Sequence, residues 1–598
     1  MNGGYFPTEW GWPALAFVLV TLLAVLLRDR VALSRREQAT LAAFGALAVW
    51  TLLSIAWSNA TEPVLSAERL LVYVTFLAAV FLVTTRRTAA LLPAGVLAAA
   101  FAVCTYAVIT RLFPGRVESW PPSDGYQLAT PIGYWNGVGI LAAIGGLVAV
   151  GFVAEEAPRA ARALAAATLP VLLTALYLTF SRGSSAAFVL GLAVALALER
   201  RRLRFLTLAA ATLVFAAVAV LFARQADALT HAGASLASAT SAGHRLALVL
   251  ALCTAASAAV GWAAVAAEQR VQLAGRARRV VVAALAGLAA LAIVVALVAA
   301  GGPIALADRA TKSFRAPLPR SGGDLNRRLV SLSSNGRTEY WRVAWTEIRD
   351  RPLLGGGAGS YERYWHRYRR TSYETLNAHS LYLEALAELG PAGLVLLAAA
   401  LGLPLAALGR ARGASGVTAA AAAYAAFVAH AALDWDWQIP ADTLAGLACG
   451  AAVLVAARPP GAGTPVSGRA RALATAALVP LAACAIVVEV GNSALARSSS
   501  ALERDDPAAA AAAARRAHRW APWSAESWQR LGEAQLVAGD LEAARRSLRH
   551  AIRLDGSEWS SWYDLAEASS GPARARALDE AERLNPRSRE VATLRTKG

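Results

Sequence analysis

Long apolar runs constrain the fold of this chain more than any other feature. About fourteen such runs recur along it, and 57% of its 598 residues are hydrophobic. An α-helix needs about 20 apolar residues to cross the hydrocarbon core of a bilayer. The sequence therefore predicts an all-α, polytopic membrane helix bundle rather than a soluble enzyme. The predicted spans are 11–27, 39–57, 68–84, 91–110, 135–153, 163–180, 184–198, 205–222, 245–267, 279–300, 379–408, 417–433, 441–457 and 470–490.

Arginine-rich loops occur at every second connection between these runs. They are the loops 28–37, 85–90, 154–162, 199–204, 268–278, 409–416 and 458–469. The positive-inside rule places them in the cytoplasm, so the other loops and both ends of the chain are expected to face outward. The first run follows Glu9 and has no basic start. We therefore expect it to be a membrane helix and not a cleaved signal peptide.

The segment after residue 491 repeats with a period of 34 residues, which is the period of tetratricopeptide helix pairs. The recurring residues are Trp528 and Trp562, Leu531 and Leu565, and Ala534 and Ala568. The repeats divide the chain into a membrane domain, 1–491, and an extracytoplasmic, tetratricopeptide-like α-solenoid, 492–598. Stacked helix pairs leave a concave surface that suits a protein partner. A generic alanine-rich helical tail is the alternative.

The predicted outer loop 301–378 is too long for a simple connection and is expected to be ordered. Arg337 stands near the start of a predicted amphipathic helix. Pro352 and four glycines then break the chain and let the backbone turn sharply, and rings alternate with cations from Tyr361 to Arg370. Two interpretations of this last stretch stay open. In one it is an interfacial anchor; in the other its rings stack on sugars and its cations hold a phosphorylated group.

Several motifs follow one another along the predicted outward-facing segments. The stronger ones are Asn335-Gly336-Arg337 with Trp341 and Trp345, Pro352-Leu353-Leu354-Gly355-Gly356-Gly357, and Asn377-Ala378-His379-Ser380 with Tyr382 and Glu388-Leu389-Gly390. The weaker ones are Ser181-Arg182-Gly183, Gly133-Tyr134-Trp135-Asn136-Gly137 and Asp434-Trp435-Asp436-Trp437. In this order they resemble the O-antigen ligase and polymerase superfamily. Its members are bacterial membrane enzymes that move a glycan from a polyprenyl diphosphate carrier to an acceptor.

Two arginines and one histidine suit this chemistry as catalytic residues. The reaction must neutralise the departing diphosphate and remove a proton from the acceptor hydroxyl. Arg182 and Arg337 match the functional arginines of the family, and guanidinium groups make bidentate, permanently charged contacts with phosphate. His379 matches the family's histidine, and an ordinary pKa of about 6.5 suits a proton acceptor. The alternatives are a helix-end cap for Arg182 and a satisfied helix-start residue for His379.

Further residues around these three complete the candidate site. The substrate-binding candidates are Arg342, Asn377, Tyr382, Glu384, Asn136 and Asp434. Glu388 shares a helix face with Glu384, and we assign it a structural role. His430 lies close in sequence to Asp434 and is the other histidine worth testing. Because the sequence has no metal-ligand spacing, we expect a metal-independent enzyme without a cofactor.

The resemblance and the chemistry together imply an enzyme of the bacterial cytoplasmic membrane that builds or attaches a cell-surface polysaccharide at the outer face. Its partners would be a polyprenyl (undecaprenyl) diphosphate-linked glycan, a glycan, lipid or protein acceptor, and membrane lipids, with no nucleic acid. Two other classes stay open. A flippase or transporter of the lipid-linked glycan would use Arg182, Arg337 and His379 as a translocation path. A non-catalytic scaffold would act through its repeat tail.

Overall fold

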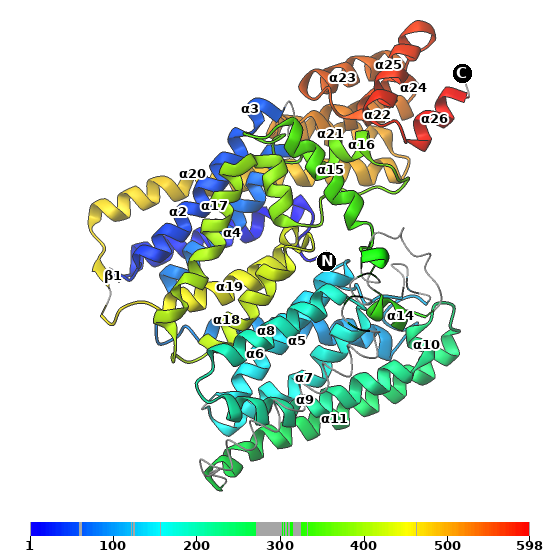
Figure 1. Cartoon of the computed structure of the whole chain (residues 1–598). Coiled ribbons are helices and arrows are strands. Elements are labelled where there is room, and N and C mark those ends of the chain that lie inside the picture. Colours follow the sequence, from blue (N-terminus) through cyan, green and yellow to red (C-terminus); the bar gives the residue numbers. More distant parts are fainter. Residues whose placement is uncertain are drawn as a thin grey trace.

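The computed structural model shows a bundle of long helices with a smaller helical tail beside one end (Figure 1). It describes residues 2–58, 62–120, 122, 126–155, 157–270, 324–331, 333–461 and 463–596, with a few positions between 302 and 314. The long helices of the bundle are α1 (Gly11–Leu27), α2 (Arg35–Leu53), α4 (Glu62–Val83), α5 (Leu91–Leu112), α6 (Trp135–Ala154), α7 (Arg159–Leu178), α8 (Arg182–Leu198), α9 (Arg202–Gln225), α11 (Leu236–Arg270), α17 (Leu381–Ala411), α18 (Val417–His430), α19 (Pro440–Ala456) and α20 (Gly468–Glu503).

Shorter elements lie at the ends of these helices. They are η1 (Pro7–Glu9), α3 (Ile55–Ser58), α10 (Asp227–Thr230), α14 (Asn326–Val330), α15 (Arg337–Asp350), α16 (Ser360–Tyr368), η2 (Asp436–Gln438) and the two-residue strands β1 (Arg30–Val31) and β2 (Thr464–Pro465). Helices α14, α15 and α16 belong to the loop predicted at 301–378. The all-α class is therefore confirmed.

Among the residues that the structure describes, ten helices are long and apolar enough to cross a membrane, and α8, α18 and α19 are shorter apolar helices. Each predicted span coincides with one of these, except 279–300, which lies outside the described residues. Helices α18 and α19 are buried along most of their length, so they pack inside the protein rather than against lipid. A polytopic membrane protein is confirmed, and the number of spans stays a prediction.

The loops gather at two opposite ends of the bundle. The end that carries the described arginine-rich loops is called here the arginine end. Contacts that join its loops run from β1 to β2, from Arg458 to the carbonyl of Thr84, and from Gly416 N to Glu155. Contacts at the opposite end run from Ala358 N to Ser54 and from Trp120 to the carbonyl of Ala234. The described loops thus alternate between the ends as predicted, and which end faces outward stays a prediction.

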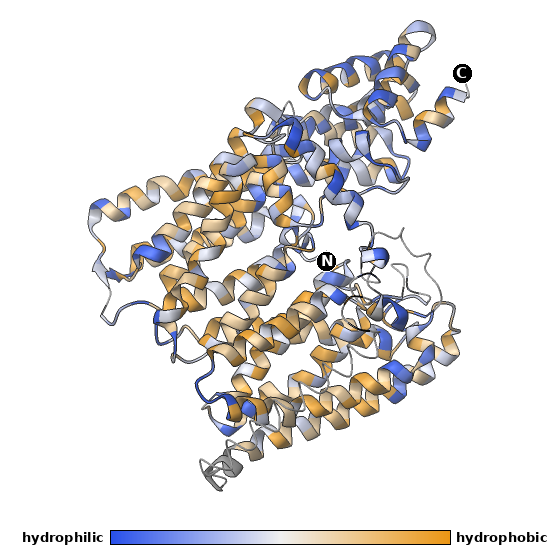
Figure 2. Cartoon of the chain, viewed as in Figure 1, coloured by the Kyte–Doolittle hydropathy of each residue, from blue (hydrophilic) through white to orange (hydrophobic). Residues whose placement is uncertain are grey.

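Helix α6 lies at the centre of the bundle because small residues let its neighbours come close. Nearly all of its residues are buried. A Cβ atom on Gly151 would meet the Cβ of Ala419 in α18 at 2.4 Å. Close backbone approach matters in a membrane, where apolar burial alone does not drive helices together. Peripheral helices instead expose leucines, as α1 does at Leu19 and Leu23, and Figure 2 shows hydrophobic residues along the helices of the bundle.

Helix α17 is broken at Gly390, where φ is 66° and ψ is −172°. Pro391 follows and has no N–H, so carbonyls before the break need other partners. Three consecutive carbonyls find donors outside the helix: Ala387 accepts from Gly356 N at 3.0 Å, Glu388 from Gly357 N at 2.7 Å, and Leu389 from Trp50 Nε1 at 2.9 Å. The glycine-rich segment 355–359 therefore docks onto the break. Three of its glycines have positive φ, which confirms the predicted sharp turn.

One helix joins the membrane region to the tail. Helix α20 continues without a break through the predicted domain boundary at 491/492. The helices that follow are α21 (Pro507–Trp520), α22 (Ala525–Val537), α23 (Leu541–Leu554), α24 (Trp559–Glu567), α25 (Gly571–Leu584) and α26 (Arg589–Thr596), each packed against the next. Asp506 and Asp540 cap α21 and α23, one repeat period apart. The tetratricopeptide assignment itself stays a prediction.

The docking of the glycine-rich segment generates a stability prediction. Gly355 has φ of 72°, and a Cβ atom there would lie 2.3 Å from the carbonyl oxygen of Glu388. We expect Gly355→Ala to destabilise the protein by at least about 2 kcal/mol, because left-handed backbone alone costs about 1–2 kcal/mol for an alanine. The thermal unfolding temperature in detergent checks this. Gly402→Ala is the matched control, since nothing lies within 4 Å of that position. Equal unfolding temperatures for both variants would contradict the docking role.

Candidate active site

The described part of the predicted outer loop 301–378 is called here the outer segment. His379 lies where this segment enters α17. Ser380 caps this helix by accepting a backbone N–H, and Leu381 N donates to the carbonyl of Ala431 at 2.8 Å, which ties α17 to the end of α18. His379 has a left-handed backbone with φ of 50°. Its ring stacks on Tyr340 of α15, with ring centres 4.5 Å apart. Tyr340 follows Arg337 by three residues and so shares its helix face. That spacing is the sequence signal that would have singled it out.

The surroundings of His379 keep its imidazole neutral. Burial lowers the pKa of His379 below its ordinary 6.5, the carboxylate of Asp434 acts in the opposite direction, and the charge of Arg337 lowers it further. Nδ1 lies 3.3 Å from the carbonyl oxygen of Asn377. In the tautomer that donates from Nδ1 to this oxygen, Nε2 keeps a free lone pair. His379 can therefore accept a proton at neutral pH.

Asp434 joins the polar groups of three segments. Its Oδ1 accepts from the Tyr134 hydroxyl at 2.7 Å, and its Oδ2 accepts from Asn136 Nδ2 at 2.6 Å and from Arg337 Nη2 at 3.0 Å. Burial by itself would raise the pKa of Asp434, but the positive charge of Arg337, the nearby His379 and His430 and the hydrogen bond from Tyr134 together outweigh it and hold that pKa below its ordinary value. Asp434 is thus a buried, ionised carboxylate, and such a group needs pairing of this kind. It sets the position of Arg337.

Arg337 stands at the first position of α15, after a turn in which Asn335 and Gly336 both have positive φ. Its Nε also donates to the carbonyl of Leu433 at 2.7 Å. The ion pair and this bond together hold the guanidinium over the loop between α18 and α19. The side chain is 17% exposed, so it is partly open to a ligand that approaches from the loop side.

Arg182 begins α8 and forms hydrogen bonds with the backbone of the outer segment. Its guanidinium donates to the carbonyls of Ser331 and Ser333, the latter at 2.8 Å. Arg328 and Arg337 both lie within electrostatic range of Arg182, so three guanidinium groups gather at this end of the bundle. Arg328, whose guanidinium lies 5.5 Å from the ring centre of Trp135, was not predicted. It stands outside every recognised motif, so the sequence held no signal for it.

Other predicted residues have structural partners. Arg342 makes a two-bond ion pair with Glu339 and donates to the carbonyl of Tyr368. Tyr382 donates to the carbonyl of Val428. The structure therefore gathers Arg182, Arg337, His379, Asn136 and Asp434 and gives Arg342 and Tyr382 supporting contacts.

The two carboxylates below His379 also have backbone partners. Glu384 accepts from Ala378 N at 2.8 Å and from Gln438 at 2.8 Å, which holds the residue before His379 in place. Glu388 accepts from Tyr361 N at 3.2 Å, and this contact supports its structural assignment.

His430 is part of a buried polar series under the start of α8. Its Nδ1 lies 3.0 Å from Asp436 Oδ2, its Nε2 lies 3.2 Å from Ser184 Oγ, and Ser184 Oγ lies 2.8 Å from Ser181 Oγ. Serine, histidine and aspartate in this order form the catalytic series of many hydrolases. Here Ser184 is fully buried and already bonded to the residue that caps α8. The series therefore ties the start of α8, where Arg182 stands, to the end of α18 and the loop that follows it.

Within the described ranges, no three or more His, Cys, Asp or Glu side chains are grouped so as to hold a metal ion. The metal independence of the reaction stays a prediction.

The fold and this polar centre define a multi-pass membrane protein with a cation-rich site at one end of its helix bundle. Residues 245–398 match the family model described as O-antigen ligase. This segment, which includes Arg337 and His379, is similar to the O-antigen ligase family, and the match supports a membrane glycan ligase or polymerase role. The family implies a lipid-linked glycan donor and a glycan or lipid acceptor. No curated protein matches the chain.

The buried ion pair gives a prediction for stability. We expect Asp434→Asn to lower the free energy of unfolding by about 3–5 kcal/mol, because it leaves the charge of Arg337 without its partner. Chemical denaturation of the purified protein measures this. The control is Asp579→Asn, which breaks an exposed ion pair of 2.8 Å with Arg595 and should change stability by no more than about 1 kcal/mol. Similar losses of unfolding free energy in both variants would contradict the stabilising role of the buried Arg337–Asp434 ion pair.

The lowered pKa of His379 gives a prediction for pH dependence. The neutral ring is the proton acceptor, so activity is expected to persist below pH 6.5 and to fall only as the pH drops through the lowered pKa of His379. The dependence of kcat/KM on pH measures this limb for the free enzyme. An acidic limb centred above pH 7 would contradict the environment described for His379.

Proposed function

We propose that the protein transfers a glycan from a polyprenyl diphosphate carrier to an acceptor hydroxyl, as a ligase or polymerase of cell-surface polysaccharide at the outer face of the bacterial cytoplasmic membrane. The observation that carries this proposal is the pairing of a neutral histidine with gathered guanidinium groups at the helix ends. His379 stands beside Arg337, and Arg182 and Arg328 lie within electrostatic range of each other.

The residues suit the two tasks of a displacement reaction, namely deprotonation of the acceptor hydroxyl and neutralisation of the leaving diphosphate. His379 Nε2 takes the proton of the acceptor hydroxyl as its oxygen forms a bond to the anomeric carbon. The bond from that carbon to the diphosphate oxygen breaks, and the leaving diphosphate keeps the electron pair. Arg182 and Arg337 would neutralise its charge, since guanidinium groups match phosphate oxygens in geometry. Asp434 holds Arg337 in place for this task, and Asn136 in turn donates to Asp434.

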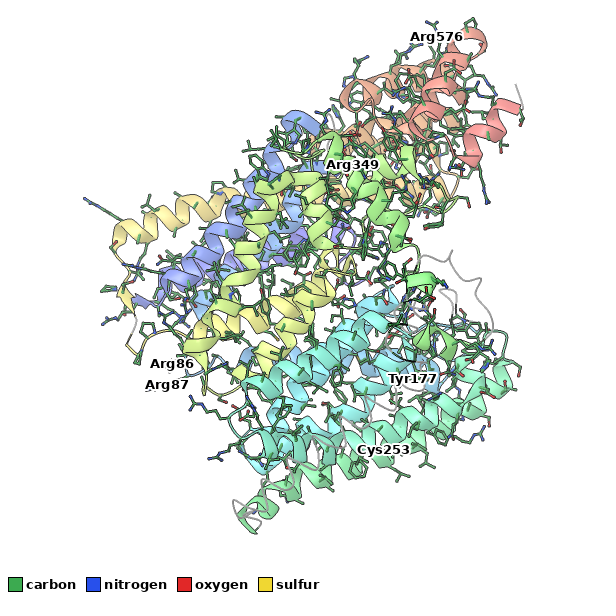
Figure 3. All side chains as sticks on the ribbon, in the orientation of Figure 1. Arg86, Arg87, Tyr177, Cys253, Arg349 and Arg576 are labelled. Atoms are coloured by element: carbon green, nitrogen blue, oxygen red, sulfur yellow. The ribbon has the colours of Figure 1, made fainter. Side chains whose placement is uncertain are left out.

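The position of the site suits a lipid-linked donor. Arg182 and His379 stand at the ends of apolar helices, α8 and α17. A polyprenyl chain could stay in the bilayer while its diphosphate reaches the polar centre at the helix ends. In Figure 3, Arg86 and Arg87 of the arginine end lie far from Arg349 in the outer segment and Arg576 in the tail. The positive-inside rule assigns the arginine end to the cytoplasm, which supports an outer-side location for the proposed site. No metal or cofactor takes part in this proposal.

Reconstitution in liposomes tests the proposal directly. The assay supplies an undecaprenyl diphosphate-linked oligosaccharide and candidate glycan or lipid acceptors, and it measures the glycosylated product. We expect His379→Ala and Arg337→Ala to lower kcat by at least about 100-fold, the scale of a lost acid–base or charge-stabilising group. Arg86→Ala is the control, because Arg86 is exposed at the arginine end.

The same assay distinguishes the alternative functions. Undiminished transfer by His379→Ala and Arg337→Ala would refute the assigned site. Movement of the lipid-linked glycan across the bilayer without product would favour the flippase. Glycan assembly that depends on the tail alone would favour the scaffold.

A further inference from the structure

The tail and the outer segment line a cavity of about 590 Å³ that lies outside the candidate active site. Three walls form most of it: the end of α3 with Trp57, helix α16, and the tail between Gly556 and Trp559 together with the end of α25. The end of α15, with Asp350 and Arg351, and Gly356 complete the lining. Cavities of about 300–1,000 Å³ are the usual size of small-molecule sites. Nothing in the family match, which ends at residue 398, covers the tail side of this cavity.

Four rings share one face of α16, because Tyr361, Tyr364, Trp365 and Tyr368 follow the spacing of successive helical turns. Tyr361 and Trp365 are fully buried and pack against Tyr340, the residue that stacks on His379. Tyr364 and Tyr368, which are stacked on each other at 5.7 Å, are half-buried at the edge of the same cluster and line the cavity. The deep burial of Tyr361 and Trp365 argues against the interfacial-anchor interpretation, in which those rings would meet lipid headgroups. The aromatic cluster therefore lies between the cavity and His379.

Specific contacts hold the tail against α16. Arg363 Nη1 donates to Ser557 Oγ at 2.7 Å and to the carbonyl of Ser58 at 3.0 Å, which joins all three walls. Below the cavity, Arg369 donates to Asn585 at 2.9 Å. Because these side-chain hydrogen bonds fix the tail against the outer segment, the cavity is a defined part of the fold and not a gap between two loosely placed domains.

The lining has the chemistry of a saccharide site. Trp57, Tyr364, Tyr368 and Trp559 offer flat rings, and Arg367 and Glu362 are among the charged groups between them. A pyranose has an apolar C–H face that stacks on rings and a rim of hydroxyls that bonds to guanidinium and carboxyl groups.

The lining is less suited to a peptide. Leu584 is the one aliphatic side chain among the described lining residues. A helical peptide that docks its apolar face needs a hydrophobic groove, whereas most residues of this lining are polar or charged.

We propose that this cavity binds a saccharide segment of the glycan substrate, remote from the reacting hydroxyl, and that the tail thereby takes part in substrate recognition. The proposal rests on the proposed glycan transfer and adds a second contact region to it. Binding of a remote segment supplies energy that positions the reacting sugar. It also accounts for the firm attachment of the tail to the outer segment.

The test measures saccharide binding by the full-length protein in nanodiscs, separately from turnover. The probe is an array of defined bacterial surface oligosaccharides, followed by titration of the tightest binder. Tyr364→Ala and Trp559→Ala should each weaken binding about 3- to 10-fold, the scale of one lost ring contact. Trp520→Ala is the matched control, because Trp520 is a 39% exposed tryptophan of the same tail outside the lining. It should bind as the wild type does.

Failures of the two proposals are distinguishable. His379→Ala should lose transfer and keep oligosaccharide binding, since His379 does not line the cavity. Ring variants that bind oligosaccharides like the wild type would overturn the saccharide site, as would wild-type protein that binds an array of peptides and none of the oligosaccharides. Arg367→Ala, at an exposed position of α16, repeats the test should a ring variant fail to fold. Weakened binding in the ring variants supports the cavity even if no transfer is found.

Discussion

The ion pair between Arg337 and Asp434 is the contact on which the site depends. Asp434 is 1% exposed, and a carboxylate buried to this degree is stable only when charge and hydrogen bonds compensate its lost hydration. Tyr134, Asn136 and Arg337 supply that compensation. Because Arg337 begins α15, the same pair fixes the helix whose Tyr340 stacks on His379. One buried charge thus orders both the proposed diphosphate-binding group and the proposed base.

The broken helix α17 supplies the second link between membrane and outer segment. Backbone carbonyls that lack helical partners cannot be left bare at membrane depth. The break at Gly390 frees such carbonyls, and the glycine-rich segment 355–359 and Trp50 satisfy them. Since Gly357 N and the Glu388 carbonyl come as close as 2.7 Å, side chains are excluded from the contact. The same helix carries the Ser380 cap next to His379, so the proposed base is held by a backbone junction and not by a flexible loop.

The aromatic cluster of α16 links the proposed chemistry to the proposed recognition. Its fully buried rings, Tyr361 and Trp365, support Tyr340 beside His379, and its half-buried rings, Tyr364 and Tyr368, line a cavity that the tail also lines. The continuity of α20 into the tail places that tail beside the outer segment without a flexible linker. A substrate glycan long enough to reach both the cavity and His379 would contact membrane region and tail together.

Reading the residues alone was enough to predict the all-α membrane class, the alternation of loops and the individual candidates Arg182, Arg337 and His379. These follow from local signals, namely apolar runs, arginine placement and short motifs. The packing of the chain alone shows that Asp434 is the partner of Arg337 and that Arg328 joins the cations. It also shows that Tyr361 and Trp365 are the fully buried rings of α16 and that the tail lines a cavity. Such relations depend on contacts between residues nearly one hundred or more positions apart, as with Arg337 and Asp434, or on how a helix face meets its neighbours. A single sequence carries no periodic pattern that reveals long-range contacts or the packing of one helix face against another, because burial and pairing are set by the packing of the whole chain.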